Sequence, residues 1–359
     1  MKRKNFYIFI LLVFFVMLFN YLMNPFEVFD DVIKQQHPFF YFGQNKYLNI
    51  KIRKDNNKYN RALVGTSSTN MCFWPVKRED DYILWGFGTE AAFLPKILDD
   101  FLDLQPNVKE VYFELHLGTF ISTVKTEYNK DITINEIFQL LYSFETINYS
   151  IKQAWQNAFS KNFEREKGSL DKRIQGDEYE ECVVYPWQQP FYKEININKD
   201  SYTEIDKIKE ICAKRGVKAK FFMIPLHCLL LSKFVEKGDY SNYEEFKRQV
   251  AKHTDFYDFS YANEYSSTDF FTKDEIVDEV YYFDVEHPFY SVGKHVLARM
   301  EGKESNFGKY VTASNVESVL QEERKAIYSY MDKNREVLNK YFSEIDKKAK
   351  ESVTLKKKK

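Results

Sequence analysis

Hydrophobic positions are concentrated most strongly in one stretch near the N-terminus. Residues 6–23 read FYIFILLVFFVMLFNYLM, and Asn20 is the only strongly polar residue among these 18. At a rise of about 1.5 Å per residue they would form a helix about 27 Å long, close to the ~30 Å hydrocarbon core of a bilayer. Because the stretch is apolar on every face, it predicts a membrane-spanning helix and not the buried helix of a soluble core.

The residues on either side of this stretch indicate how it is used. Residues 2–4 read KRK, and the positive-inside rule keeps such an end in the cytoplasm. Residues 24–27 read NPFE, which offers no small-x-small cleavage site of the kind that a signal peptide needs. We therefore expect residues 1–5 to be cytoplasmic, residues 6–23 to remain as an anchor, and the rest of the chain to be exported.

Beyond a lead-in at residues 24–57, short apolar runs alternate with segments of helical periodicity. The apolar runs predict buried strands at residues 61–65, 82–85, 108–117, 217–224 and 255–259. Apolar residues at helical spacing predict helices at residues 89–104, 135–163, 202–215 and 291–300. This alternation predicts an α/β domain over residues 58–302, with a three-layer arrangement of a parallel sheet and helices on both faces.

Two segments lie outside that alternation. Residues 164–181 read EREKGSLDKRIQGDEYEE, and such a charged, glycine-containing run predicts a surface insertion, which we place at about residues 121–200. Residues 303–359 form a charged helical pattern that ends in four lysines. We expect a solvated terminal helix packed on the domain in preference to an arm that binds a partner.

Charge and cysteine spacing narrow the classes of function. The formal net charge is −1 and the pI about 6.6, so no global field attracts nucleic acid. The four cysteines show no Cys-x-x-Cys spacing and no paired histidines, so we expect neither a metal site nor a redox motif; they are Cys72, Cys182, Cys212 and Cys228. They are interpreted as small buried hydrophobic residues, with one disulfide as the alternative in an oxidising compartment.

The first candidate for chemistry lies where the strand at residues 61–65 ends. The segment RALVGTSSTN, residues 61–70, places Ser67 two positions after Gly65, where a helix can begin. In a parallel sheet, ligands bind at the carboxyl ends of the strands. A serine there presents its hydroxyl at the sheet edge, and its N–H can face a developing oxyanion. The alternative role is an ordinary helix N-cap.

The second candidate segment lies directly before the last predicted helix of the domain. Residues 281–300 read YYFDVEHPFYSVGKHVLARM, with Asp284 three positions before His287. A serine nucleophile needs a base, and the base needs an acceptor that fixes its tautomer. This loop can supply both groups, although an isolated Asp-x-x-His is more often a surface turn.

Taken together, these segments resemble the SGNH/GDSL hydrolase-like superfamily over roughly residues 58–302. GTS at 65–67 corresponds to its Gly-Asp-Ser block, LWGFGTEAAF at 84–93 to its second block, and DVEH at 284–287 to its Asp-x-x-His block. The resemblance implies a flavodoxin-like SGNH fold with Ser67 as nucleophile, His287 as base and Asp284 orienting the base. It also implies an oxyanion hole formed by the N–H groups of Ser67 and Gly88.

The chain departs from the family pattern at two places. Thr66 replaces the aspartate of the first block, whose side chain does no chemistry in the triad. The third block of the family supplies an asparagine donor, whereas this chain reads ELHLGTF at residues 114–120. Loss of one oxyanion donor costs about 3 kcal/mol, or roughly a hundredfold in rate. Because several envelope members of the family also lack this asparagine, we expect its absence to weaken plain hydrolysis more than acyl transfer.

Three further residues are candidates for the pocket. His116 lies in the segment that lacks the asparagine, where it would substitute in part, although a histidine at a strand end is more often a core residue. Ser68 is the rival nucleophile, but the Gly-x-Ser spacing favours Ser67. His227, in IPLHCLL, follows another predicted strand.

The chain layout also resembles anchored, exported family members that act beside membrane-bound acyltransferases on polysaccharides or teichoic acids. This resemblance implies a single-pass protein of the bacterial cytoplasmic membrane, with its catalytic domain on the periplasmic or extracytoplasmic side. The expected reaction is transfer of an acyl group, most simply acetyl, to a cell-surface carbohydrate, or its removal, through an acyl-serine and without a cofactor. The alternative is a catalytically weak or inactive SGNH-like scaffold that binds glycan or an envelope complex.

Overall fold

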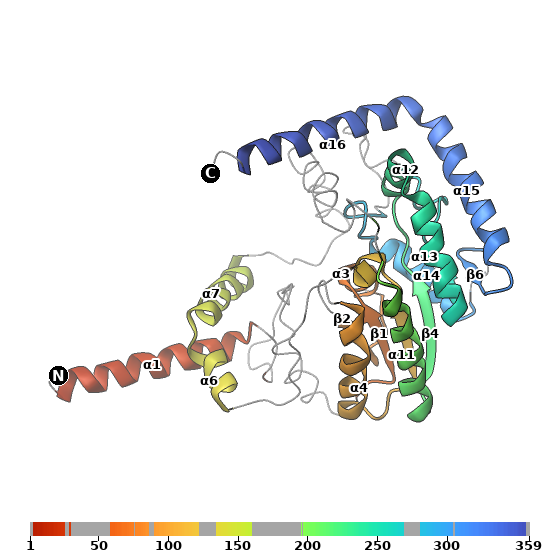
Figure 1. The fold of residues 1–359 in the computed structure, drawn as a ribbon. Coiled ribbons are helices and arrows are strands. Elements are labelled where there is room, and N and C mark those ends of the chain that lie inside the picture. Colours follow the sequence, from red (N-terminus) through yellow and green to blue (C-terminus); the bar gives the residue numbers. More distant parts are fainter. Residues whose placement is uncertain are drawn as a thin grey trace. The chain divides into compact units, whose positions relative to one another are not determined.

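The computed structural model of the 359-residue chain describes residues 3–25, 29, 58–74, 76–85, 90–121, 134–159, 195, 197–268, 281–303 and 306–356 (Figure 1). The chain divides into two units, a helical unit and an α/β unit. The helical unit contains α1 (Arg3–Met23), α6 (Ile134–Tyr142) and α7 (Phe144–Phe159). Among the described residues one helical span, Asn5–Met23, is long and apolar enough to cross a membrane.

The predicted α/β class is confirmed by a six-stranded sheet in the order β2-β1-β3-β4-β5-β6. The first five strands pair in parallel and overlap the five predicted apolar runs; they are β1 (Arg61–Gly65), β2 (Asp81–Trp85), β3 (Glu110–Glu114), β4 (Lys218–Met223) and β5 (Phe256–Asp258). The sheet is not wholly parallel, because β6 (Lys309–Val311) pairs antiparallel with β5. Its three residues are too short for a hydrophobic pattern to reveal, and antiparallel edge strands on parallel sheets are common.

The helical stretch expected at residues 135–163 is two helices, α6 and α7. Ser143 separates them, and its hydroxyl accepts the N–H of Thr146 at 3.1 Å. A serine in this position caps the first turn of the following helix, so a single side chain interrupts an otherwise continuous pattern. Residues 122–133 and 160–194, which fall in the expected insertion, lie outside the described residues.

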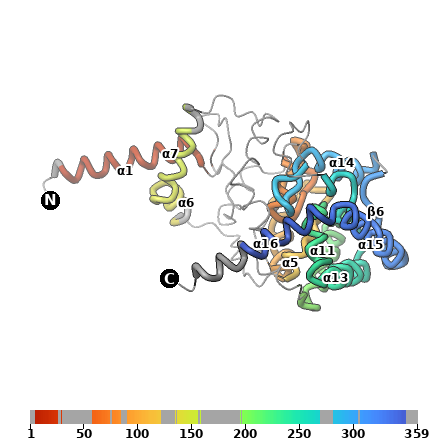
Figure 2. Tube along the Cα trace, turned by 90° about the horizontal axis from the view of Figure 1, so that it is seen from above, coloured from red at the N-terminus to blue at the C-terminus, as the bar shows by residue number. Residues whose placement is uncertain are grey.

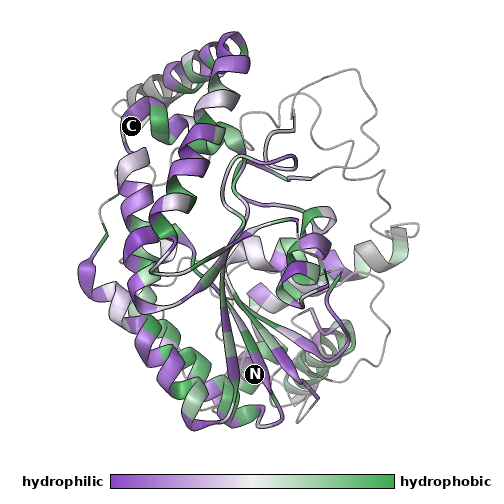
Figure 3. Cartoon of the chain, turned by 90° about the vertical axis from the view of Figure 1, so that its right-hand side faces the viewer, coloured by the Kyte–Doolittle hydropathy of each residue, from purple (hydrophilic) through white to green (hydrophobic). Residues whose placement is uncertain are grey.

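Helices of the α/β unit cover both faces of the sheet, as Figure 1 shows. In chain order, the first four α-helices among the described residues of this unit are α3 (Ser67–Phe73), α4 (Leu94–Leu104), α5 (Leu117–Ile121) and α11 (Thr203–Lys214). Those nearer the C-terminus are α12 (Cys228–Lys237), α13 (Tyr240–His253), α14 (Tyr290–Met300), α15 (Val316–Lys333) and α16 (Arg335–Lys356). Burial on both faces explains why the strands read as nearly continuous apolar runs, and Figure 3 shows hydrophobic positions along them.

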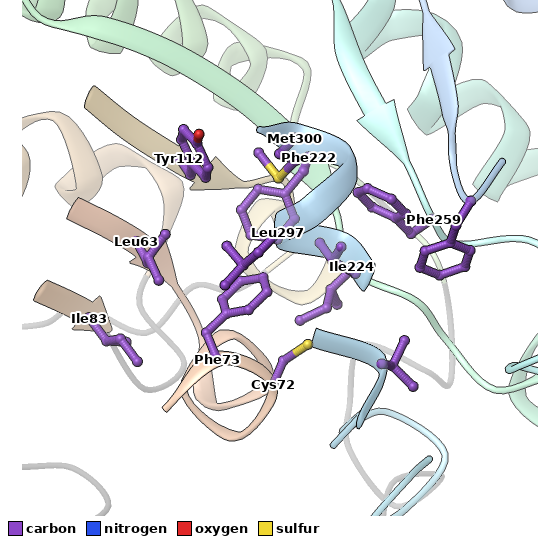
Figure 4. Close-up of a cluster of buried hydrophobic side chains, with 13 residues drawn as sticks. Leu63, Cys72, Phe73, Ile83, Tyr112, Phe222, Ile224, Phe259, Leu297 and Met300 are labelled. Carbon is purple, nitrogen blue, oxygen red and sulfur yellow. The ribbon is translucent and has the colours of Figure 1, made fainter. Parts of the chain in front are cut away.

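One face of the sheet packs against α3 and α14 to form the core cluster of Figure 4. The strands contribute Leu63, Ile83, Tyr112 and Phe222, and the two helices contribute Cys72, Phe73, Val292, Val296, Leu297 and Met300. Ring centroids of Phe73 and Phe222 lie 5.7 Å apart in an edge-on arrangement. Three of the four cysteines, Cys72, Cys212 and Cys228, are buried free thiols, as interpreted from the sequence, and Cys182 lies outside the described residues.

The helix α15 is tied to the sheet through a buried lysine. Lys247 of α13 contacts Asp258 of β5 at 2.7 Å and Glu323 of α15 at 2.8 Å, and all three side chains are at most 2% exposed. Figure 2 shows α15 beside α13. Two carboxylates share one ammonium, and burial together with the neighbouring Asp258 raises the pKa of Glu323 to about 7. Loss of one partner from such a buried cluster typically costs about 3–5 kcal/mol.

The contact between α3 and α14 depends on a glycine. A β-carbon at Gly293 would overlap the backbone carbonyl of Cys72, so only glycine permits this approach. Helix α3 begins at Ser67, and α14 follows the loop that carries Asp284 and His287. The glycine contact therefore brings together two segments that are far apart in the sequence.

Replacing Gly293 by alanine is expected to lower the free energy of unfolding by about 1–3 kcal/mol, because an extra carbon is forced into a packed contact. This loss should appear although alanine favours a helix over glycine by about 0.5–1 kcal/mol. The exposed Lys294, replaced by alanine, is the control on the same helix. Equal unfolding free energies for the two variants, measured by denaturant titration, would contradict the close packing.

Candidate active site

The turn from β1 into α3 presents Ser67 at the sheet edge. Thr66 is the N-cap of α3, and its hydroxyl oxygen accepts the N–H of Ser68 at 3.2 Å. Ser67 is therefore the first residue of the helix, and its side chain stays partly exposed while those of Ser68 and Thr69 are buried. The strand-to-helix turn expected from GTS thus forms, with the threonine and not the serine as cap.

Ser67, His287 and Asp284, the three residues predicted to act together, form one hydrogen-bonded chain. The Ser67 Oγ lies 2.8 Å from His287 Nε2. The His287 Nδ1 lies 2.8 and 2.7 Å from the two carboxylate oxygens of Asp284. Since a carboxylate only accepts, Nδ1 carries the proton, and in the neutral ring Nε2 is left to accept from the serine hydroxyl.

Backbone hydrogen bonds fix the carboxylate that holds the histidine. Asp284 Oδ1 accepts the N–H groups of Glu286 and His287, each at 2.8 Å. The Ser68 hydroxyl donates to the Glu286 carbonyl at 3.1 Å, which joins this loop to α3. Ser68, the rival nucleophile, thus has a buried hydroxyl used in positioning the loop.

The charge of His287 is governed by two opposing effects. Burial disfavours the imidazolium, but the Asp284 carboxylate and its hydrogen bond, together with Glu286 and Glu114, outweigh burial and raise the pKa of His287 to about 9. The His287 side chain is 17% exposed, so one side of the ring remains open. The neutral form of His287, which can accept the serine proton as a general base, therefore dominates only above about pH 9.

Glu114, at the end of β3, supports the turn beneath Ser67 and was not singled out from the sequence. Its Oε2 accepts the Thr66 N–H at 2.6 Å, the Thr66 hydroxyl at 2.9 Å and the Thr69 hydroxyl at 2.7 Å. A β-carbon at Gly65 would overlap this carboxylate and the Thr69 hydroxyl, which explains the glycine of GTS. The sequence signal for Glu114 is that it is the one acidic residue among the apolar residues 111–115, VYFEL.

Glu286 is the second acidic residue that sequence reasoning missed. Burial raises its pKa to about 7 against the opposing charge of His287, with a further contribution from Glu114 included in that value. Its Oε1 is buried without a hydrogen-bond partner among the described residues. The carboxylates of Glu286 and Glu114 add to the effect of Asp284 and raise the pKa of the His287 ring.

His227, a candidate for the pocket, has both ring nitrogens engaged in hydrogen bonds. Its Nδ1 accepts the N–H of Leu229 at 3.1 Å, which caps α12, and its Nε2–H donates to the carbonyl of Thr268 at 2.8 Å. The ring is 2% exposed, and burial lowers its pKa to about 4, so it stays neutral. With both nitrogens engaged and the ring buried, His227 is a structural cap.

His116 follows β3 at the same edge as Ser67. Burial lowers its pKa, Glu114 opposes the shift, and the neighbouring charge of His287 lowers it further. Its Nδ1 accepts the N–H of Gly118 at 3.1 Å. Gly88, the expected second oxyanion donor, lies outside the described residues. Within the described residues, no cluster of metal-ligating side chains occurs.

The reactivity of the serine should depend on the protonation of His287. Because its pKa is about 9, most rings are protonated at pH 7, so the rate of reaction with a fluorophosphonate should rise with pH and be half-maximal near pH 9. Asp284→Asn should move that midpoint to lower pH, because burial then opposes the imidazolium with less compensation, and should lower the limiting rate by about 10⁴. A midpoint unchanged by the substitution would contradict the assigned cause of the shift.

A scan of the sequence against protein-family models found no match, and a search of curated proteins found no significantly similar sequence. The geometry therefore carries the functional argument. It places a serine hydroxyl, an imidazole and a carboxylate in hydrogen-bonding sequence at the edge of an α/β sheet. This arrangement can activate a serine for attack on a carbonyl carbon.

Proposed function

We propose that this chain is a serine-dependent acyl-ester enzyme of the bacterial cell envelope. It would transfer an acyl group, most simply acetyl, to a cell-surface carbohydrate, or remove it, through an acyl-serine intermediate. The observation that carries the proposal is the hydrogen-bonded chain from Ser67 through His287 to Asp284. The order of these residues along the sequence, which resembles that of SGNH enzymes, supports the proposal. We propose the SGNH fold together with the function.

In the first half of the reaction, the Ser67 Oγ attacks the carbonyl carbon of an acyl ester. His287 Nε2 takes the hydroxyl proton, and Asp284 stabilises the resulting imidazolium. The tetrahedral intermediate carries its negative charge on the former carbonyl oxygen, which the N–H of Ser67 would bind together with that of Gly88. When the intermediate collapses, the leaving alkoxide receives the proton from His287 and the acyl group stays on Ser67.

In the second half, a carbohydrate hydroxyl or a water molecule attacks the acyl-serine. His287 removes a proton from the attacking hydroxyl and then returns it to the Ser67 oxygen as the ester bond breaks. A carbohydrate acceptor gives transfer, and water gives hydrolysis. None of these steps requires a metal or an organic cofactor.

The anchor determines where this chemistry would take place. We infer that α1 crosses the cytoplasmic membrane with residues 1–5 inside, so that the α/β unit acts on the extracytoplasmic side. An acyl donor and a glycan acceptor would meet it there, and a membrane-bound acyltransferase would be a suitable neighbour to supply acyl groups.

The direct test is intact-mass measurement of the full chain in detergent after treatment with a fluorophosphonate. We expect one phosphonyl adduct on the wild type and none on Ser67→Ala or His287→Ala. Ser68→Ala should still form the adduct, because the Ser68 hydroxyl bonds to the Glu286 carbonyl and not to the base. Acyl donors and glycan acceptors would then be screened on the reactive chain.

A matched control is available for the histidine. His253 also pairs with an aspartate, Asp206, with its Nδ1 2.6 Å from Oδ2. His253→Ala should therefore label as the wild type does, since within the part of the chain that the structure describes no serine hydroxyl bonds to His253. A folded wild type that forms no adduct would contradict the enzyme and favour a glycan-binding scaffold.

A further inference from the structure

Helix α7 buries three polar side chains and exposes three large apolar ones. Side chains at most 1% exposed are Thr146, Ser150 and Gln153. The exposed side carries large apolar groups at spacings of seven and four residues, with Phe144 87%, Ile151 54% and Trp155 66% exposed. This is the reverse of a helix on a water-soluble domain, whose apolar stripe faces the core.

The neighbouring helix α6 extends this exposed apolar surface. Phe138 and Tyr142 of α6 are 47% and 48% exposed. We call the set Phe138, Tyr142, Phe144, Ile151 and Trp155 the α6–α7 apolar surface. Soluble proteins rarely leave so many large apolar groups on one pair of helices, and such surfaces commonly mark protein or membrane contacts.

Contacts with α1 place these helices near one end of the spanning segment. Both α6 and α7 pack against α1 within the helical unit. The Asn20 side-chain N–H donates to the Leu141 carbonyl at 2.7 Å, and Asn20 is 1% exposed. Asn20 lies three residues before Met23, where α1 ends, which corresponds to about 4.5 Å along the helix.

We propose that the α6–α7 apolar surface lies in the interfacial layer of the bilayer, in contact with phospholipid where headgroups meet acyl chains. This proposal rests on the membrane anchor proposed above, but not on the enzymatic activity. A helix pair bonded to the last turn of a spanning helix is held at the depth where tryptophan and tyrosine side chains favour the interface. Large apolar side chains on the exposed side of such a helix pair match the boundary between headgroups and acyl chains.

Trp155 provides a direct probe of this contact. The full chain would be reconstituted in phosphatidylcholine nanodiscs, with and without bromine on the acyl chains, and tryptophan emission compared. The chain has 4 Trp, none of them in residues 5–23, so the spanning helix contributes no emission of its own. We expect brominated lipid to quench the wild type and the Trp155→Phe variant to lose most of that quenching.

Trp74→Phe, in the α/β unit, is the matched control and should keep the quenching or raise its fraction. Equal quenching in the wild type and Trp155→Phe would overturn the proposal and favour coverage of this surface by protein. A chain that alkaline carbonate washes off vesicles would overturn the anchor and the interfacial contact together. Neither outcome bears on the chemistry of Ser67.

An independent observation concerns two histidines that follow neighbouring strands. His116 follows β3 and His227 follows β4, and in each the Nδ1 accepts a backbone N–H two residues later, at 3.1 Å. With Nδ1 as an acceptor, the neutral ring of each carries its proton on Nε2. The two rings therefore share this backbone contact and the same tautomer, and they differ in the surroundings of Nε2.

That difference separates a structural from a chemical role. His227 donates its Nε2–H to the Thr268 carbonyl, whereas the Nε2 of His116 has no hydrogen-bond partner among the described residues. The parallel register pairs Val64 with Phe113. Ser67 and His116 each follow three residues later, beyond the carboxyl ends of these two neighbouring strands, and the charge of His287, which is bonded to Ser67, acts on His116. Burial lowers the pKa of His116, so the ring is a neutral donor near the reacting serine.

The geometry points to His116 Nε2–H as a donor to the oxyanion formed at Ser67, because His116 follows β3, the strand that pairs directly with β1. This inference rests on the proposed function, because it assigns a donor to the same reaction. A neutral N–H donor fixed by a backbone hydrogen bond requires little reorganisation as negative charge develops.

The test compares fluorophosphonate labelling rates and 4-nitrophenyl acetate hydrolysis in His116→Ala and His116→Asn. We expect alanine to lower the labelling rate and kcat by about 10²–10³ with KM little changed, and asparagine to restore most of the loss. A purely structural role would lower the thermal midpoint without this selective fall in kcat. His227→Ala is the control and should lower the thermal midpoint while labelling within about threefold of the wild type below it, since its ring only caps α12.

His116→Ala labelling as fast as the wild type would overturn this assignment and leave the proposed function standing. Labelling lost equally in His116→Ala and His116→Asn would also contradict a donor role, because asparagine supplies a donor. A wild type that does not label, in contrast, would overturn the proposed function and the assignment together.

Discussion

The close approach of α3 and α14 over one face of the sheet is the contact on which the site depends. Helix α3 carries Ser67 at its start, and the loop before α14 carries Asp284 and His287. Gly293 allows α14 to meet the Cys72 backbone, and the apolar cluster of Figure 4 holds both helices on the strands. The 2.8 Å hydrogen bond between Ser67 and His287 thus follows from the packing of these two helices.

Buried carboxylates determine the electrostatics of this edge. Asp284 bonds directly to the imidazole, while Glu114 organises the β1–α3 turn through Thr66 and Thr69. The carboxylates favour the imidazolium of His287, which forms when the ring accepts the serine proton. One acidic side chain thereby serves two purposes, since Glu114 fixes the geometry of the turn and contributes to the charge felt by the base.

Much of this arrangement could be read from local patterns. The runs that became β1–β5 are apolar because both sheet faces are covered, and the Asp-x-x-His spacing suits a loop in which one carboxylate reaches both the ring and two backbone N–H groups. Other features arise only from tertiary packing. The edge strand β6 is too short to show a pattern, and Glu114 is recognisable as a support only once β3 lies beside β1.

The two histidines show the same limit at the level of single residues. His116 and His227 both follow apolar strands and both accept a backbone N–H, so sequence alone could not distinguish them. Their roles diverge because Thr268 receives the second nitrogen of His227, whereas His116 follows β3, the strand that pairs directly with β1. Helix α7 is a further case, since its periodicity predicted a helix without indicating that its polar side would be buried.

The central claim is that the hydroxyl of Ser67 becomes covalently acylated with His287 as its base. The most direct measurement is peptide mass mapping after rapid mixing of the chain with 4-nitrophenyl acetate and quenching in acid. The account predicts one acetyl group on the peptide that contains residues 61–70, localised to Ser67 by fragmentation and missing when His287 is replaced by alanine. An acetyl group on Ser68, or acylation of Ser67 that persists without His287, would contradict it.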